Sequence, residues 1–353
     1  MLTPDAILSV LRPVQDPELQ KSLVELNMIR DVAIADGRVS FTLVLTTPAC
    51  PLRELIVEDC EKAVKTLAGV EQVDVTVTAE TPQQKSLPDR QAVGQVRNIV
   101  AISSGKGGVG KSTVAVNVAV ALAKTGARVG LLDADIYGPN APTMLGLSGA
   151  AVKVEQSPQG EVLEPVFNHG IKMVSMGFLI DPDQPVIWRG PMLNGIIRQF
   201  LYQVNWGALD YLIVDMPPGT GDAQLTLTQS VPMAGAVIVT TPQTVSLLDA
   251  RRGLKMFQQM GVNVLGIVEN MSYFIPPDLP DRHYDLFGSG GGAKASRELN
   301  VPLLGCVPLE ISLREGGDAG VPIVISAPES ASAQALTAIA QQIAAKVSIA
   351  AYA

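Results

Sequence analysis

The stretch "GKGGVGKS", residues 105–112, constrains this chain most, because it fits the phosphate-loop pattern G-x-x-x-x-G-K-[ST]. It lies between "NIVAISS", an apolar run typical of a buried strand, and "KSTVAVNVAVALAKTG", a helical segment closed by Gly126. The pattern predicts a nucleotide site in which Lys111 contacts the β- and γ-phosphates and the Ser112 hydroxyl binds Mg²⁺. The residues expected to bind the nucleotide are Gly105, Lys106, Gly107, Gly108, Val109, Gly110, Lys111, Ser112 and Thr113.

Acidic residues follow other apolar runs further along the chain. "RVGLLDAD" ends in Asp133 and Asp135, and "YLIVDMPPGTGD" carries Asp215. Short apolar runs alternating with helical segments predict an α/β fold, a P-loop NTPase with a mostly parallel sheet and helices on both faces. Ligands bind such sheets beyond the carboxyl ends of the strands. We therefore expect Asp215 to be the Walker-B acid of the magnesium shell, with Asp133 as a second candidate, and "PPGTGD" to be a mobile loop that senses the γ-phosphate.

The chain is predicted to contain two domains. Residues 1–82 form a small α/β domain, with a capped helix from "TPDAILSVL", a hairpin at Asp36-Gly37, a second helix and the alternating strand "VEQVDVTVTAE". The polar, proline-containing residues 83–97 are the expected linker, and residues 98–353 are the nucleotide-binding domain. A length of 353 residues with 47% hydrophobic side chains suffices for two packed cores.

Charge and cysteine content argue against several classes of function. The net charge of −8 disfavours non-specific binding to nucleic acid or anionic lipid. Three widely separated cysteines do not suggest a disulfide framework. The first residues lack the apolar core of a signal peptide, and no apolar run approaches the ~18 residues of a membrane span. We therefore expect a cytoplasmic protein with neither a nucleic-acid partner nor a membrane partner.

"GKGGVGKST", with its additional Lys106, resembles the deviant Walker A motif of the SIMIBI ATPases, which include ParA, MinD, nitrogenase iron protein and ArsA. In that group the extra lysine reaches the nucleotide of the other subunit, where a cation supplied in trans offsets transition-state charge. The resemblance implies an ATP-hydrolysing homodimer in which Lys106 and Lys111 are catalytic. It also implies that Asn270 binds adenine and that Asp135 orients the attacking water.

Within this group the chain is similar to the Mrp/ApbC family of iron–sulfur carrier ATPases, over nearly all of residues 97–345. The motifs are "VRNIVAISSGKGGVGKST", "LLDADIYGPNAPTMLG", "WRGPM", "DYLIVDMPPGTGDAQLT", "VENMSYF" and "LREGGDAGVPIV". The N-terminal unit, with "DPEL" and "TTPACP", resembles the small domain of iron–sulfur assembly proteins. The similarity implies that the chain binds iron–sulfur clusters and delivers them to apoproteins.

The chain departs from this family after "ENMSYF", where most members carry a Cys-x-x-Cys pair. The segment "IPPDLPDRHYDLFGSGGG" has no cysteine, whereas a [4Fe–4S] cluster takes four thiolates. Its prolines favour an exposed loop over a site for a harder metal built from Asp278, Asp281, His283 and Asp285. Cys50 precedes a helix expected to start near Pro51, and a helix N-terminus can lower the pKa of a nearby thiol, which would suit reaction or cluster binding. The alternative is that Cys50 is a small residue packed in the core. Cys60 and Cys306 are expected in packed cores.

Two alternative functions remain open besides the cluster carrier. A nucleotide-gated adaptor that has lost cluster binding would explain the missing cysteine pair. A MinD- or ParA-like positioning ATPase would need a surface to bind. The C-terminal segment "PESASAQALTAIAQQIAAKVSIAAYA" has one lysine and no Trp or Phe, which does not fit a helix lying on a membrane.

Overall fold

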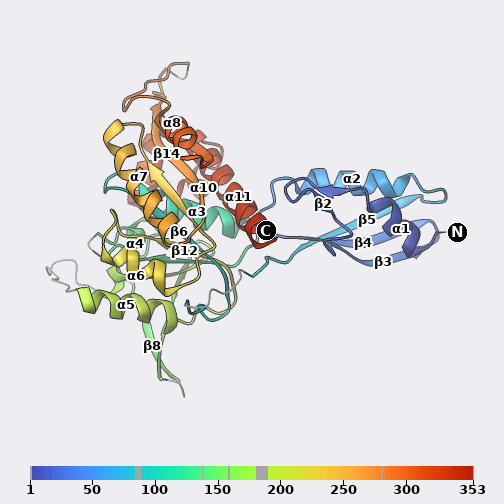
Figure 1. Cartoon of the computed structure of the whole chain (residues 1–353), viewed down its shortest axis with the longest axis horizontal. Coiled ribbons are helices and arrows are strands. Elements are labelled where there is room, and N and C mark those ends of the chain that lie inside the picture. Colours follow the sequence, from blue (N-terminus) through green and yellow to red (C-terminus); the bar gives the residue numbers. More distant parts are fainter. Residues whose placement is uncertain are drawn as a thin grey trace. The chain divides into compact units, whose positions relative to one another are not determined.

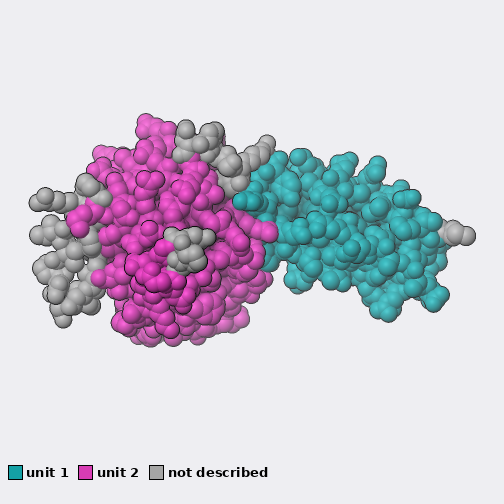
Figure 2. All heavy atoms as spheres, turned by 90° about the horizontal axis from the view of Figure 1, so that it is seen from below, with its two compact units in different colours: residues 1–83, 344–353 teal, residues 84–343 magenta. Residues whose placement is uncertain are grey.

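The structure is a computed structural model that describes residues 2–83, 90–136, 138–157, 160–179, 190–279 and 281–352. The chain divides into two compact units, coloured separately in Figure 2. Unit 1 comprises Met1–Gln83 and Ala344–Ala353, and unit 2 comprises Gln84–Ile343. The sequence predicts that residues 344–353 belong to the nucleotide-binding domain, because nothing in the Ala-rich C-terminal segment marks a boundary; the structure assigns them to unit 1. Trp188 and Arg189 of "WRGPM", and Pro280, lie outside the described residues.

Unit 1 is built on a three-stranded sheet in the order β3-β4-β5. β3 and β4 are antiparallel, and β5 runs parallel to β4. Asp36 and Gly37 join β3 to β4 with φ angles of 46° and 79°, the left-handed conformation of a tight hairpin turn. The elements are α1 Pro4–Leu11, β1 Gln15–Asp16, β2 Lys21–Ser22, β3 Ile29–Ala35, β4 Arg38–Leu45, α2 Arg53–Lys65 and β5 Gln72–Ala79.

The core of unit 1 lies between this sheet and the helices α1 and α2. The Thr3 hydroxyl caps α1 by accepting the Ala6 N–H at 3.2 Å, as its sequence predicts. Phe41, Ile56 and Cys60 are buried in one cluster, so the expectation that Cys60 is a core residue is confirmed.

Unit 2 is built on an eight-stranded sheet in the order β10-β11-β7-β12-β6-β13-β14-β15. β10 is antiparallel to β11, and the remaining neighbours pair in parallel. Helices cover the sheet, as the alternating pattern predicts (Figure 1). The strands are β6 Val96–Ser104, β7 Val129–Asp133, β10 Val166–Asn168, β11 Ile171–Ser175, β12 Leu209–Asp215, β13 Gly235–Thr240, β14 Val264–Phe274 and β15 Leu303–Leu309, with a separate hairpin of β8 Lys153–Ser157 and β9 Gly160–Glu164.

The helices of unit 2 connect these strands. They are α3 Lys111–Lys124, α4 Ala141–Met144, the 3₁₀ turn η1 Met176–Phe178, α5 Gly190–Tyr202, α6 Asp222–Ser230, α7 Thr244–Gln259, α8 Gly291–Leu299, α9 Ile311–Ala319, α10 Ile323–Ser326 and α11 Ala331–Tyr352, which continues into unit 1. Among the described residues, no helix combines the length and the apolar character needed to cross a membrane.

The order of the central strands brings the chemically important residues together. β12 lies between β7 and β6, and its last residue, Asp215, is in register with Asp133 and Ile102. All seven residues of β12 are buried, because both faces of a parallel sheet are covered. The phosphate loop follows β6 directly. The carboxyl ends of three neighbouring strands therefore present the loop and two aspartates at one edge of the sheet.

Candidate functional site

The phosphate loop connects β6 to α3 and depends on its glycines. Gly108 and Gly110 have φ angles of 79° and 81°, a left-handed conformation that side chains disfavour. A Cβ atom at Gly110 would lie 2.1 Å from Asn270 Nδ2, and one at Gly105 would lie 2.1 Å from the carbonyl carbon of Asp249. The loop is thus packed between β14 and the backbone of α7, which only glycine permits.

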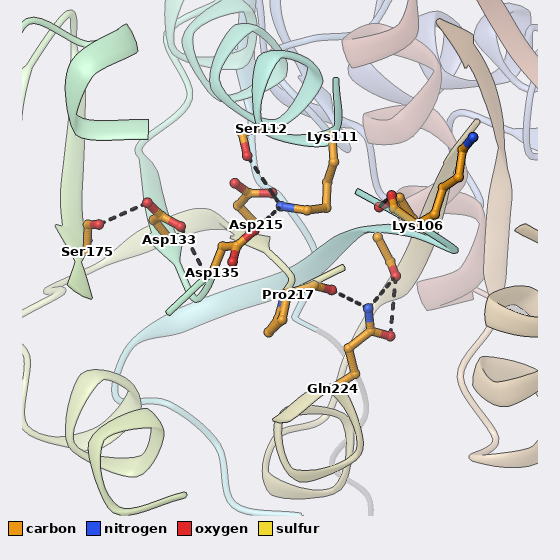
Figure 3. A network of polar contacts seen from close by, with 11 residues as sticks. Lys106, Lys111, Ser112, Asp133, Asp135, Ser175, Asp215, Pro217 and Gln224 are labelled. Atoms are coloured by element: carbon orange, nitrogen blue, oxygen red, sulfur yellow. Dashed lines mark hydrogen bonds and ion pairs between the residues drawn. The ribbon is translucent and has the colours of Figure 1, made fainter. Parts of the chain in front are cut away.

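Lys111 opens α3 and lies inside the acidic cluster (Figure 3). Its Nζ donates to Asp215 Oδ1 at 2.5 Å, lies 3.6 Å from Asp135 Oδ2 and is 3.3 Å from Ser112 Oγ. Burial alone would lower the pKa of Lys111, but the carboxylates of Asp215, Asp135 and Asp133 outweigh it and the pKa is raised. The lysine is therefore charged and neutralised by protein carboxylates.

Asp215 is the candidate magnesium residue whose side chain retains a free acceptor. It is fully buried, and its Oδ2 has no hydrogen-bond partner among the described residues. Burial raises the pKa of Asp215 against the opposing effects of Lys111 and Ser112. A buried carboxylate oxygen without a partner is costly, which fits a position completed by a cation or its water.

Asp133 holds its neighbours in position. Its Oδ2 accepts from Ser175 Oγ at 2.9 Å and its Oδ1 accepts from the Asp135 backbone N–H at 3.1 Å. Burial and the adjacent Asp215 raise the pKa of Asp133 to about 8. Both of its carboxylate oxygens are already hydrogen-bonded, so Asp215 offers the better magnesium position. Sequence reasoning missed Ser175, because its contact with Asp133 bridges two strands that are distant in the chain.

A second network links the end of β6, just before the phosphate loop, to the loop after β12. The buried Gln224, in the first turn of α6, donates through Nε2 to the Pro217 carbonyl and to Ser103 Oγ (Figure 3). The Gly219 N–H donates to the Ser104 carbonyl at 3.1 Å. Residues on both sides of the "PPG" turn are therefore attached to the strand that carries the phosphate loop. Gln224 was not anticipated, because a polar residue early in a helix gives no sign of burial.

Lys106 is oriented differently from Lys111. Its backbone carbonyl accepts from Ser104 Oγ at 2.9 Å, while its side chain points away from the acidic cluster (Figure 3). Within the described part of the chain, no ion pair involves Lys106. The second lysine is therefore not paired with any carboxylate that the structure describes.

Asn270 and a cavity lie beside the loop. Asn270 is buried, and its Nδ2 donates to the Val109 carbonyl at 2.8 Å. A cavity of about 390 Å³ is lined by Thr113 at the end of the loop, by Asn270 itself, by apolar residues including Met271, Pro308, Leu309 and Leu313, and by the charged residues Glu310, Arg314 and Asp318. Apolar walls with polar groups between them suit a planar heterocycle.

The segment that replaces the family's cysteine pair is exposed, as its prolines predict. Asp278, Asp281, His283 and Asp285 are all exposed, and His283 Nε2 lies 3.2 Å from Asp285 Oδ1. The described residues contain no group of three or more His, Cys, Asp or Glu side chains that could hold a metal ion. The alternative of a harder metal at this segment therefore has no geometric support.

Cys50 differs from expectation in its pKa. α2 begins at Arg53, close to the expected start near Pro51, and Cys50 is half-buried against the unit 1 core. Burial, with added effects of Glu18 and Asp16, raises the pKa of Cys50 to about 11 despite a hydrogen bond from the Leu52 backbone. The expected lowering of this thiol pKa is therefore wrong, because desolvation outweighs the helix end.

Cys306 is only half-buried, so its expected place in a packed core is met in part. Its Sγ lies 3.8 Å from Glu269 Oε1.

Family models cover most of the chain. The model described as NUBPL iron-transfer P-loop NTPase matches residues 95–344, and the one described as iron-sulfur cluster assembly protein matches residues 4–77. A Synechocystis protein named iron-sulfur cluster carrier protein is 92% identical over 351 residues, covering 99% of each chain. The Escherichia coli protein of the same name is 43% identical over 341 residues, covering 97% of this chain and 90% of its own.

Solved structures agree with the fold. A nucleotide-binding protein from Archaeoglobus fulgidus, in complex with ADP, has a TM-score of 0.56 and 41% identity, covering 64% of this chain and 87% of its own. The cell division ATPase MinD of Pyrococcus furiosus has a TM-score of 0.50 and 24% identity, covering 70% and 98%, which indicates the fold alone. The predicted P-loop α/β fold is confirmed, and the chain belongs to the NUBPL-type family of iron-transfer P-loop NTPases.

Proposed function

We propose that this chain is an ATP-hydrolysing carrier that binds iron–sulfur clusters and delivers them to apoproteins. The ATPase part rests on the buried pair of Lys111 and Asp215, whose atoms Nζ and Oδ1 lie 2.5 Å apart at the end of the phosphate loop. The other carboxylate oxygen of Asp215 has no partner among the described residues. A lysine can leave this pair for a polyphosphate, which supplies the same negative charge. Mg²⁺, when bound, would neutralise phosphate charge, and Asp215 and Ser112 would hold it.

The remaining site residues divide the work of binding and hydrolysis. The amides of the loop from Gly105 to Thr113 bind phosphates, and the cavity beside Asn270 takes the adenine ring. Asp135, next to Lys111, orients the attacking water. Lys106, turned away from its own acidic cluster, acts on the nucleotide of a second copy, which makes the active form a homodimer.

The carrier part is supported by relatives named iron-sulfur cluster carrier protein at 92% and 43% identity over nearly the whole chain. They favour this function over an adaptor without a cluster and over a positioning ATPase. We propose Cys50 of two copies as cluster ligands, with the rest of the coordination supplied from outside the chain, because a [4Fe–4S] cluster takes four. The cytoplasmic location remains a prediction from the sequence.

Hydrolysis is tested with Lys111→Ala. We expect loss of ATP turnover with a retained circular dichroism spectrum. Turnover at the wild-type rate would refute the assignment of the phosphate loop.

Cluster binding is tested by anaerobic reconstitution with iron and sulfide. We expect iron and acid-labile sulfide on the wild type and on Cys306→Ala, and their loss on Cys50→Ala. A cluster that survives Cys50→Ala excludes this ligand, and no cluster on the wild type leaves the adaptor function.

A further inference from the structure

A second cavity lies in unit 2, between α5, α6 and the first described residues after the linker. Its volume is about 620 Å³, and the described residues that line it are all polar or charged. The helices α5 and α6 lie side by side (Figure 1). None of the nucleotide-site residues described above lines this cavity. It is therefore a separate site.

The charged groups of this cavity are two arginines. Arg90 enters from the linker side and Arg198 from α5, and no carboxylate is among the described residues that line it. Like charges are unfavourable neighbours unless an anion lies between them. The cavity is thus locally cationic on a chain whose net charge is −8.

Arg90 carries an unmet hydrogen-bond donor. Its Nη2 donates to the Met260 carbonyl at 2.5 Å, which fixes the guanidinium. Its Nη1 is buried and has no hydrogen-bond partner among the described residues. Buried polar atoms in folded proteins are nearly always paired, and an exception often marks a bound water or ion. A guanidinium held in place by the Met260 carbonyl is suited to an oxyanion.

Neutral groups complete the lining. Thr226 Oγ1 donates to Asn194 Oδ1 at 2.8 Å, so the group of Asn194 not used in this bond is its amide NH₂, a donor. Gln229 adds another amide at the carboxyl-terminal end of α6. Guanidinium and amide donors are the usual recognition elements for a phosphate group.

We propose that this cavity binds the phosphate group of a small molecule, with Arg90 and Arg198 as its principal ligands. The volume lies in the range of small-molecule sites, of roughly 300–1,000 Å³. Large polyanions such as nucleic acids are disfavoured by the negative net charge of the chain.

The test must exclude phosphate binding at the nucleotide site. The full-length protein is first saturated with Mg²⁺ and a non-hydrolysable ATP analogue, with saturation checked by displacement of a fluorescent nucleotide. Inorganic phosphate is then titrated in an isothermal calorimeter at constant ionic strength, with chloride as the control anion. We expect one saturable phosphate site and no saturable heat with chloride. Absence of a saturable phosphate signal refutes the proposal.

Variants then assign the site. Arg198→Gln should weaken phosphate binding at least tenfold, because a charge-assisted bidentate contact is lost, while Arg198→Lys should retain part of it. Arg90→Gln should weaken phosphate binding similarly. Because Arg90 also donates a hydrogen bond to the Met260 carbonyl, this variant could fail to fold, in which case the Arg198 variants decide the test. Arg251→Gln removes an exposed arginine paired with Glu298 elsewhere and should change nothing. Equal phosphate affinity in Arg198→Gln and the wild type would place the anion elsewhere and overturn the assignment. If the protein does not bind the ATP analogue in the first step, that result counts against the proposed ATPase function and not against phosphate binding in this cavity.

Discussion

The hydrogen bonds of Gln224 give a sharp prediction about how the loop after β12 is held. Gln224→Leu keeps a buried side chain of similar size but removes its bonds to the Pro217 carbonyl and Ser103 Oγ. Each buried polar group left without a partner costs roughly 1–3 kcal/mol. We therefore expect unit 2 to lose about 2–4 kcal/mol of unfolding free energy.

The assay is urea unfolding followed by tryptophan fluorescence. Both tryptophans, Trp188 and Trp206, belong to unit 2 in the sequence, and Trp206 is buried, so the signal reports on that unit. With a slope of about 3 kcal/mol per M, the midpoint should fall by roughly 1 M urea. ATP turnover should fall as well, while ADP affinity stays within about twofold, because the phosphate loop itself is intact.

Two further variants separate hydrogen bonding from packing. Gln258→Leu, at an exposed position of α7, is the matched control and should shift the midpoint little. Gln224→Glu keeps the shape but turns an acceptor toward the Pro217 carbonyl, so it should destabilise at least as much as leucine. Equal midpoints for Gln224→Leu and Gln258→Leu would refute the reasoning.

Three other outcomes are expected. Gly105→Ala should destabilise unit 2 by about 1–3 kcal/mol in urea unfolding, because the added Cβ would meet the Asp249 backbone. Gly107→Ala, whose Cβ would have no atom within 4 Å, should change the unfolding free energy by less than about 0.5 kcal/mol. Equal losses in the two variants would contradict the packing argument. Because the folded pKa of Asp133 is about 8 and its ordinary value is 3.8, the unfolding free energy should decline as pH rises between these values, and Asp133→Asn should flatten that decline in a pH series. Alkylation of Cys50, followed by mass spectrometry, should be slow at pH 8 and accelerate toward pH 11; rapid alkylation at pH 7 would contradict its burial.

The central part of the fold could be predicted because local signals and topology agree. A glycine-rich turn between a buried strand and a helix permits few structures, and α3 begins at the predicted Lys111. The aspartates at strand ends could be placed at the sheet edge because parallel strands align their carboxyl ends. The turn at Asp36-Gly37 could be predicted because few residue pairs readily adopt two successive positive φ angles.

What the sequence could not predict depends on contacts between distant segments. The bond from Ser175 to Asp133 and the burial of Gln224 arise from strand order and helix packing, which no local pattern encodes. The thiol pKa of Cys50 was misjudged for a related reason, since desolvation depends on what packs against a side chain. The boundary between the units falls inside the continuous helix α11, where no sequence signal marks it. The end of this helix belongs to unit 1, where Ser348 Oγ lies 3.4 Å from the Thr46 carbonyl oxygen.

The ion pair of Lys111 and Asp215 has a consequence for the order in which ligands assemble. While the lysine occupies Asp215, a divalent cation approaching alone meets an ammonium group at that carboxylate. In the function proposed above, an arriving polyphosphate would draw the lysine away and release the carboxylate in the same exchange. Binding of metal would then depend on binding of nucleotide, and the lysine would act as an internal counterion that keeps free cations out of the empty site.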